Sequence, residues 1–250
     1  MKKLKKPLLF TLCILPLAVV GAYLSVRMAL ASADASQLEP MIAQLGSREA
    51  VVLASCVQPV VYVLVSAFFG YILAEKLGLL RPLRFEKAKT LRVLWVSVLC
   101  GALLSLDAWT FARWIPELDY GAQGRFDAVT WLASILYGGV LEEVMLRWFV
   151  MSLLAFLIWR LLFRREAAVP AGALIAANVL AALLFAAEHL PATVQTFGGL
   201  TPLLLLRCFL LNGAAGLVFG RFYRKYGIHY AMLSHALFHI VSHTIWLLAF

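Results

Sequence analysis

Residues 128–163 read AVTWLASILYGGVLEEVMLRWFVMSLLAFLIWRLLF, an apolar run with two acids and one base at its middle. Such a run is typical of a membrane-spanning helix, since about 20 apolar residues cross the hydrocarbon core. A charge at the bilayer centre costs about 2.5 to 3.5 kcal/mol even on a mild insertion scale. Glu142, Glu143 and Arg147 therefore predict either an internal ion pair or a polar cavity.

Composition extends this prediction to the whole chain. Of the 250 residues, 63% are hydrophobic and 14% are charged, which excludes a soluble domain. Apolar runs predict seven spans, at residues 7–27, 51–74, 93–115, 128–163, 168–190, 199–220 and 228–249. We therefore expect an all-α, polytopic transmembrane helical bundle. It would be a multi-pass integral membrane protein, located in the cell membrane if the source is a bacterium.

The run at 128–163 is too long for one straight crossing of a bilayer. Three explanations stay open: the helix projects beyond the membrane, it tilts, or it breaks. Gly138-Gly139 is the point at which we expect such a break.

Basic residues predict the orientation of the bundle. Sixteen of the 22 lie at the N-terminus or in segments 75–92, 160–166 and 221–225, and four lie on the other side. The positive-inside rule then places the N-terminus in the cytoplasm and the C-terminus outside, which labelling of segment 75–92 from outside the cell would contradict. The first span resembles a signal peptide, but its apolar run exceeds a signal core and Arg27 follows, so we expect it to be retained.

The net charge of +9 does not indicate a nucleic-acid partner, because the lysines and arginines lie between apolar spans and form no basic face. The lipid bilayer is the expected partner. Cysteines lie singly within the spans, without metal-binding or lipid-attachment motifs, and predict packing rather than chemistry.

The two adjacent acids are expected to have different roles. Glu143 and Arg147 are four residues apart, about 40° around a helix, and can form an ion pair. Glu142 points about 100° away and is left free to face a cavity. It is therefore the candidate general base, with a purely structural ion-pair network as the alternative.

Histidines supply the next candidates. His189 closes the fifth span, four residues after Phe185, while His235, His239 and His243 lie on one face of the seventh span. A proton-accepting glutamate with several imidazoles suits water activation and oxyanion stabilisation, the two needs of amide hydrolysis. Depth opposes this grouping, because straight parallel helices would hold the histidines of the seventh span away from His189.

We expect no cofactor, with zinc as the alternative. Glu142, His189, His235 and His239 are residue types that bind zinc, although the motif His-Glu-x-x-His is absent. A transporter would also use buried carboxylates and histidines, but it usually has repeated halves, whereas the polar motifs here cluster in the second half.

Three motifs in chain order resemble the CAAX protease and bacteriocin-processing family, also called Abi, of intramembrane endopeptidases. They are Glu142-Glu143-x-x-x-Arg147, Phe185-x-x-x-His189 and His235-x-x-x-His239, and the resemblance covers residues 128–245.

The resemblance implies a helical bundle with a polar cavity and a membrane-associated protein or peptide as substrate. In it Glu142 and His189 activate a water, while His235 and His239 stabilise the oxyanion. The implied division of the chain is an N-terminal region of three spans at 1–127 and a catalytic core at 128–250.

The chain departs from the family pattern at three positions. The family usually has Asn or Asp where His239 stands, prefers Phe at Leu146, and often has Gly at Trp148. A histidine at 239 can still donate one hydrogen bond, with a different pH dependence, and Trp148 would narrow the cavity. The alternative function is a non-catalytic membrane protein of the same family that acts by binding, as a regulator or a bacteriocin-immunity factor.

Overall fold

A computed structural model describes residues 4–31, 33, 35–116, 118 and 125–250, and these residues form helices and connecting turns without a strand. Seven helical segments are long and apolar enough to cross a membrane, which confirms the all-α bundle and the seven predicted spans. They are Lys5–Ala31, Arg48–Lys76, Lys87–Thr110, Ala128–Leu162, Ala171–Phe197, Pro202–Tyr226 and Ile228–Ala249.

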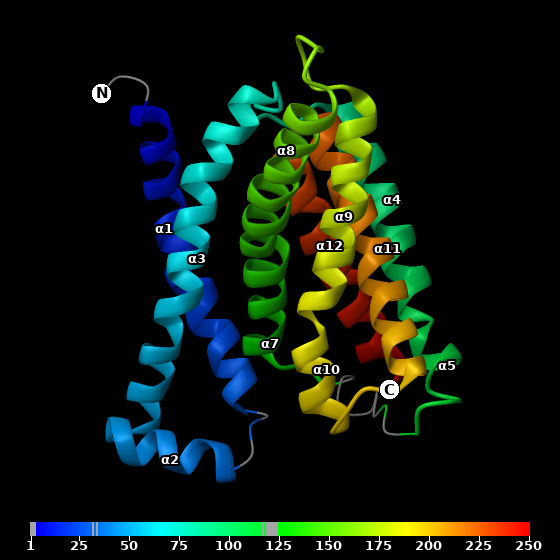
Figure 1. Cartoon of the computed structure of the whole chain (residues 1–250). Helices are drawn as coiled ribbons and strands as arrows, with labels where there is room; N and C mark the ends of the chain where they lie inside the picture. Colours follow the sequence, from blue (N-terminus) through cyan, green and yellow to red (C-terminus); the bar gives the residue numbers. More distant parts are fainter. Residues whose placement is uncertain (1–3, 32, 34, 117, 119–124) are drawn as a thin grey trace.

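The helices form two groups. One side of the bundle is a pair, α1 (Lys5–Ala31) and α3 (Arg48–Lys76), joined at one end by the short α2 (Ala35–Leu45). The other side contains α4 (Lys87–Ser105), α5 (Asp107–Thr110), α9 (Ala171–Glu188), α10 (Leu190–Phe197), α11 (Pro202–Tyr226) and α12 (Ile228–Ala249). Figure 1 shows that the continuous helix formed by α7 (Ala128–Ala133), η2 (Ser134–Met151) and α8 (Ser152–Leu162) stands between them.

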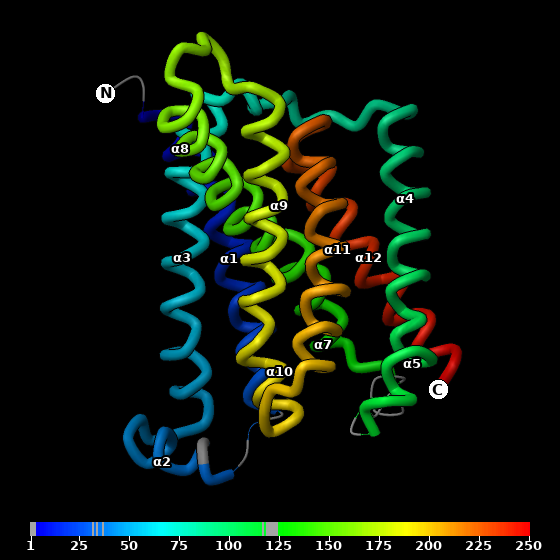
Figure 2. Tube along the Cα trace, turned by 45° about the vertical axis from the view of Figure 1, so that its right-hand side comes forward, coloured from blue at the N-terminus to red at the C-terminus, as the bar shows by residue number. Residues whose placement is uncertain are grey.

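The two ends of the chain lie at opposite ends of the bundle, as an odd number of crossings requires (Figure 1). Which end faces the cytoplasm stays a prediction from the basic residues. Figure 2 shows α11 and α12 between α9 and α4, and α12 packs against η2, α4 and α11. This placement surrounds α12, which carries four histidines, with protein along most of its length.

Several span boundaries differ from the predicted ones, and the sixth span ends at Tyr226 instead of residue 220. The third span was expected at 93–115, but it begins at Lys87 and ends at Thr110. Its early lysines can reach water at the helix end, so charge does not stop the helix there. The fifth span was expected to end at 190, but it runs on to Phe197 through a break at His189. Pro191 follows this break, and a proline cannot donate the backbone hydrogen bond that a continuous helix needs.

The fourth span does not break at Gly138-Gly139, so that expectation was wrong. Residues 134–151 form a π-helix, whose hydrogen bonds join residues five apart. The two glycines lie within it at a close contact with α12: a Cβ at Gly139 would lie 2.8 Å from the Cα of Ala236, and one at Gly138 would lie 2.7 Å from His239 Nε2. Their absent side chains allow this contact.

The start of the fourth span is capped by Asp127, whose carboxylate accepts a hydrogen bond from the Thr130 amide at 2.8 Å. Hydrogen bonds from the hydroxyl and amide of Thr130 lower the pKa of the Asp127 carboxyl. The helix therefore begins at the residue where the predicted apolar run begins.

Trp148 attaches the α1–α3 pair to the rest of the bundle. Its indole nitrogen donates to the Ala67 carbonyl at 3.2 Å, and its ring lies 5.0 Å from that of Phe10 and 6.0 Å from that of Tyr71. Gly70 gives the indole room on α3. The expectation that Trp148 narrows the polar cavity was wrong, because the residue points to the neighbouring helix pair.

We predict that Gly139→Ala lowers the free energy of unfolding by about 1 to 3 kcal/mol, because the new methyl group meets the α12 backbone. Gly213→Ala is the matched control, since a Cβ at Gly213 meets nothing within 4 Å. It should leave stability unchanged or raise it by up to about 1 kcal/mol through helix propensity. Melting temperatures in one detergent test this, and equal effects of the two substitutions would contradict the close contact.

Candidate active site

Glu143 is the centre of the polar cluster. Its Oε1 lies 3.1 Å from Arg147 Nη1 and 2.9 Å from His235 Nδ1. All three side chains are at most 2% exposed. The predicted ion pair of Glu143 and Arg147 is confirmed, and His235, from a helix almost a hundred residues later, joins it through the same carboxylate oxygen.

Aromatic rings complete the surroundings of Arg147. The guanidinium carbon lies 4.3 Å from the ring centroid of Phe185 and 5.4 Å from that of Phe219, both suited to cation–π attraction. Gly216 leaves room for this head group, since a Cβ there would lie 3.0 Å from Nη2. Nη1 takes part in the ion pair with Glu143, and Nη2 has no hydrogen-bond partner among the described residues.

Glu142 has different surroundings from its neighbour. It is half-buried and makes no hydrogen bond or ion pair with any described residue. It is nevertheless close enough to His235, Tyr137 and Glu188 to interact electrostatically with each of them. The two acids therefore differ in their surroundings, as predicted. The Glu143 carboxylate is held in an ion pair, and the Glu142 carboxylate has no ion-pair partner among the described residues.

His189 occupies the break between α9 and α10. Its Nδ1 lies 2.7 Å from the Phe185 carbonyl oxygen, which can only accept, so Nδ1 carries a proton. Thr193 donates to the His189 carbonyl at 3.0 Å and fixes the turn from the other side. In the neutral ring Nε2 then has a free lone pair, which suits contact with a water.

The histidines of α12 form a stack. The rings of His235 and His239 are 4.9 Å apart, those of His239 and His243 are 6.1 Å apart, and both pairs are nearly parallel. The Nε2 atoms of His235 and His239 lie 3.1 Å apart, so one of them donates to the other. Since the Glu143 carboxylate holds a proton on His235 Nδ1, neutral His235 accepts this bond and His239 donates it.

All six predicted site residues come together, although their positions along the spans predicted different depths in the membrane. Glu142, Arg147 and His189 each act electrostatically on His235, and His189 also acts on His239. The close contact of η2 with α12 and the break in α9 at His189 make this grouping possible. Straight, parallel α-helices would have held these residues at different depths.

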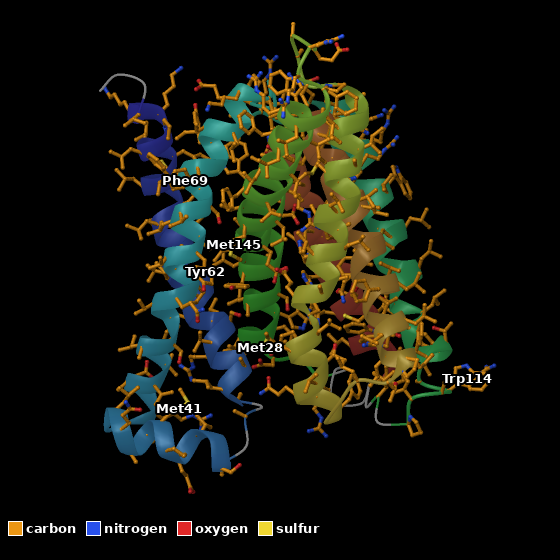
Figure 3. The ribbon with its side chains drawn as sticks, viewed as in Figure 1. Met28, Met41, Tyr62, Phe69, Trp114 and Met145 are labelled. Carbon is orange, nitrogen blue, oxygen red and sulfur yellow. The ribbon has the colours of Figure 1, made fainter. Side chains whose placement is uncertain are left out.

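An apolar cavity of about 520 Å³ opens beside the cluster, between α3, η2 and α9. Figure 3 shows Tyr62 of α3 and Met145 of η2 lying near each other at this cavity. Glu188 is the one charged residue in its lining, and it is the residue just before His189. The cavity thus reaches Glu188, which lies close enough to Glu142 to interact with it electrostatically.

Sequence reasoning gave no role to two residues of this region, Glu188 and Phe219. A signal for Glu188 existed, because it is an intramembrane acid next to a candidate histidine. Phe219 gave none, since an apolar residue in an apolar span indicates only packing; its ring stacks on His235 at 4.2 Å.

Other polar residues of the spans have structural roles. Asp107 and Arg207 form an ion pair at 2.6 Å. Ser234 is hydrogen-bonded to Ser97 of α4 at 2.7 Å and faces away from Glu143. Gly216 and Gly220 lie at the close contact of α11 with α9.

The family that the motifs resemble is often described as metal-dependent. Within the described part of the chain, no three His, Cys, Asp or Glu side chains are arranged to hold one ion. His235 and His239 also use ring nitrogens in bonds to Glu143 and to each other. We therefore derive no step through a metal.

Comparison with known protein families agrees with the geometry. Residues 124–241 match the family model described as type II CAAX prenyl endopeptidase Rce1-like. This part of the chain is an Rce1-like domain. No curated protein and no solved structure matches the chain.

The Rce1-like domain contains all six candidate site residues, from Glu142 to His239. Its family is one of CAAX-type intramembrane proteases, and the match supports this class of protein at the level of the family. A lipid bilayer and peptide substrates are the partners that the family implies. The α1–α3 pair lies outside the matched residues.

We predict that Glu143→Gln lowers the free energy of unfolding by about 3 kcal/mol, because it leaves the Arg147 charge buried without its counterion. Glu75→Gln, at an exposed position near the end of α3, is the control and should change stability little. Denaturation of both variants in the same lipid measures the difference. A Glu143→Gln variant as stable as Glu75→Gln would show that the ion pair does not hold the fold.

Proposed function

We propose that this protein is an intramembrane endopeptidase that hydrolyses peptide bonds in a membrane-associated protein or peptide. The observation that carries the proposal is the difference between two adjacent acids. Glu143 is fixed by Arg147 and His235, whereas Glu142 forms no ion pair with any described residue and, like His189, lies close enough to His235 to act on it electrostatically. A purely structural network would be expected to engage both carboxylates.

In the proposed reaction Glu142 takes a proton from a water that His189 Nε2 helps to position. The resulting hydroxide attacks the peptide carbonyl carbon and gives a tetrahedral intermediate. Collapse of this intermediate breaks the C–N bond, and Glu142 returns its proton to the leaving amine. One water is consumed, and the products are a carboxylate and an amine.

His235 and His239 are proposed to stabilise the oxyanion of the intermediate. In the resting hydrogen bond between their Nε2 atoms only one proton is available. This Nε2 proton can turn to the oxyanion, while the Glu143 carboxylate keeps the other proton on His235 Nδ1 and fixes the orientation of that ring. Glu143 is thus a positioning residue that acts through His235.

The cavity beside the cluster supports a membrane-embedded substrate. Its lining is apolar apart from Ser66, Tyr62 and Glu188, so it suits an apolar side chain or a lipid group of a peptide held in the bilayer. The scissile bond would then reach Glu142 from the lipid side, beyond the reach of soluble peptides.

We predict that Glu142→Gln lowers turnover of a cleavable membrane peptide by at least about 100-fold and leaves the melting temperature nearly unchanged, since it removes the base but keeps its size. Glu188→Gln is the matched control: it removes a second carboxylate from the same region and should keep most activity. Peptidase profiling of both variants in lipid is the measurement.

Two outcomes would contradict this assignment. If Glu142→Gln retains wild-type turnover while Glu188→Gln loses it, Glu188 is the base. If the wild type and both variants bind the membrane peptide but none of them cleaves it, the alternative of a non-catalytic regulatory or immunity protein is correct.

We also predict metal independence. Turnover should survive exhaustive chelation, because His235 and His239 already bond to Glu143 and to each other. Activity assays and elemental analysis of the same sample check this. Stoichiometric zinc, whose removal abolishes turnover and whose return restores it, would overturn the water-only mechanism.

A further inference from the structure

A polar pocket, separate from the apolar cavity described above, lies at the end of the bundle where α1 begins, away from the proposed active site. Its volume is about 220 Å³, equal to about seven waters. The α3–α4 connection, the start of α4 and the corner between α11 and α12 form its walls. Figure 3 shows nitrogen atoms of side chains gathered at this end of the molecule.

The lining of this pocket is strongly cationic. Four of its side chains are basic, Arg81, Arg84, Lys89 and Lys225, and one is acidic, Glu86. The Glu86 carboxylate lies 2.8 Å from Lys89 Nζ, and this hydrogen bond lowers the pKa of Glu86, so the acid stays ionised and neutralises that lysine. The other three cations form no ion pair with any described residue.

Hydrogen bonds fix the pocket walls in place. Tyr230 Oη accepts from the Glu86 amide at 2.7 Å, and His229 Nε2 donates to the Arg84 carbonyl at 3.1 Å. The ring of Phe85 lies 5.3 Å from that of His229. Nδ1 of His229 is buried, and no described residue forms a hydrogen bond with it. The backbone that carries Arg84 and Glu86 is therefore fixed against the start of α12, and the basic residues of the lining surround a preformed hollow.

The loop beside the pocket carries features of a membrane surface. Leu83 is 72% exposed and Phe85 is 60% exposed, and Arg84 stands between them. Apolar side chains next to arginines are typical of segments whose apolar parts enter the lipid while the cations stay at the phosphate level. A soluble anion would not account for these two exposed apolar residues.

We propose that this pocket binds the phosphate of an anionic phospholipid headgroup. Basic pockets between membrane helices recognise such headgroups, and arginine matches phosphate oxygens through two parallel hydrogen bonds. The pocket includes the corner at which α12 begins, and α12 carries His235. A bound headgroup therefore also holds the starting point of the histidine helix.

The test uses the full chain, purified in detergent, delipidated and titrated with phosphatidylglycerol or phosphatidylcholine under native mass spectrometry. Phosphatidylglycerol should fill one saturable site, and phosphatidylcholine should bind much more weakly. The double variant Arg84→Gln and Lys225→Gln should weaken phosphatidylglycerol binding by about 30-fold, the loss expected for two interfacial cations. Arg164→Gln with Arg165→Gln removes two exposed cations from the α8–α9 connection, outside the pocket, and should bind like the wild type.

Both double variants should melt at the wild-type temperature without anionic lipid, since all four positions are exposed. The single variant Arg84→Glu provides a second test, with binding at least about tenfold weaker. Equal phosphatidylglycerol affinity in the two double variants, or equal affinity for both lipids, would overturn the proposal. Saturation by inorganic phosphate without a phosphatidylglycerol site would identify a soluble phosphate as the ligand and would overturn the lipid assignment.

Discussion

The buried ion pair of Glu143 and Arg147 is the constraint on which the rest of the structure depends. Lipid cannot solvate either charge, so protein must surround both on all sides. Helix η2 supplies the pair itself, α9 and α11 supply the rings that cover Arg147, and α12 supplies His235 as a further partner for the carboxylate. Four helices therefore have to meet at one point, and glycines at the contacts let them approach.

The same constraint separates the functions of two neighbouring acids. Successive residues on a helix point in different directions, so only one of two adjacent carboxylates can enter the ion pair. Glu142 is left at the edge of the cluster, near Glu188 and the apolar cavity. A membrane protein can thus keep a reactive acid beside lipid at limited cost, because the fixed neighbour and its arginine stabilise the helix that carries both.

The two groups of helices contribute different parts of the proposed site. Polar residues of the second half make the proposed catalytic cluster, and α3 from the first half forms one wall of the cavity that leads to it. Trp148 joins the halves through contacts with α1 and α3. The family match ends short of this helix pair, so the shape of the opening is a property of residues that the match does not cover.

The sequence by itself determined the membrane class, the seven spans and the ion pair of Glu143 and Arg147, because each depends on local composition or on spacing within one helix. Hydropathy needs no partner, and the i, i+4 ion pair lies on a single segment. The tertiary structure alone decided how η2, α9 and α12 bring those motifs to one depth. The ring of Phe219 on His235 and the fit of Gly139 against Ala236 are contacts between distant segments. Such contacts leave no local signal, because a glycine or phenylalanine in an apolar span looks the same whether it faces lipid or a catalytic histidine.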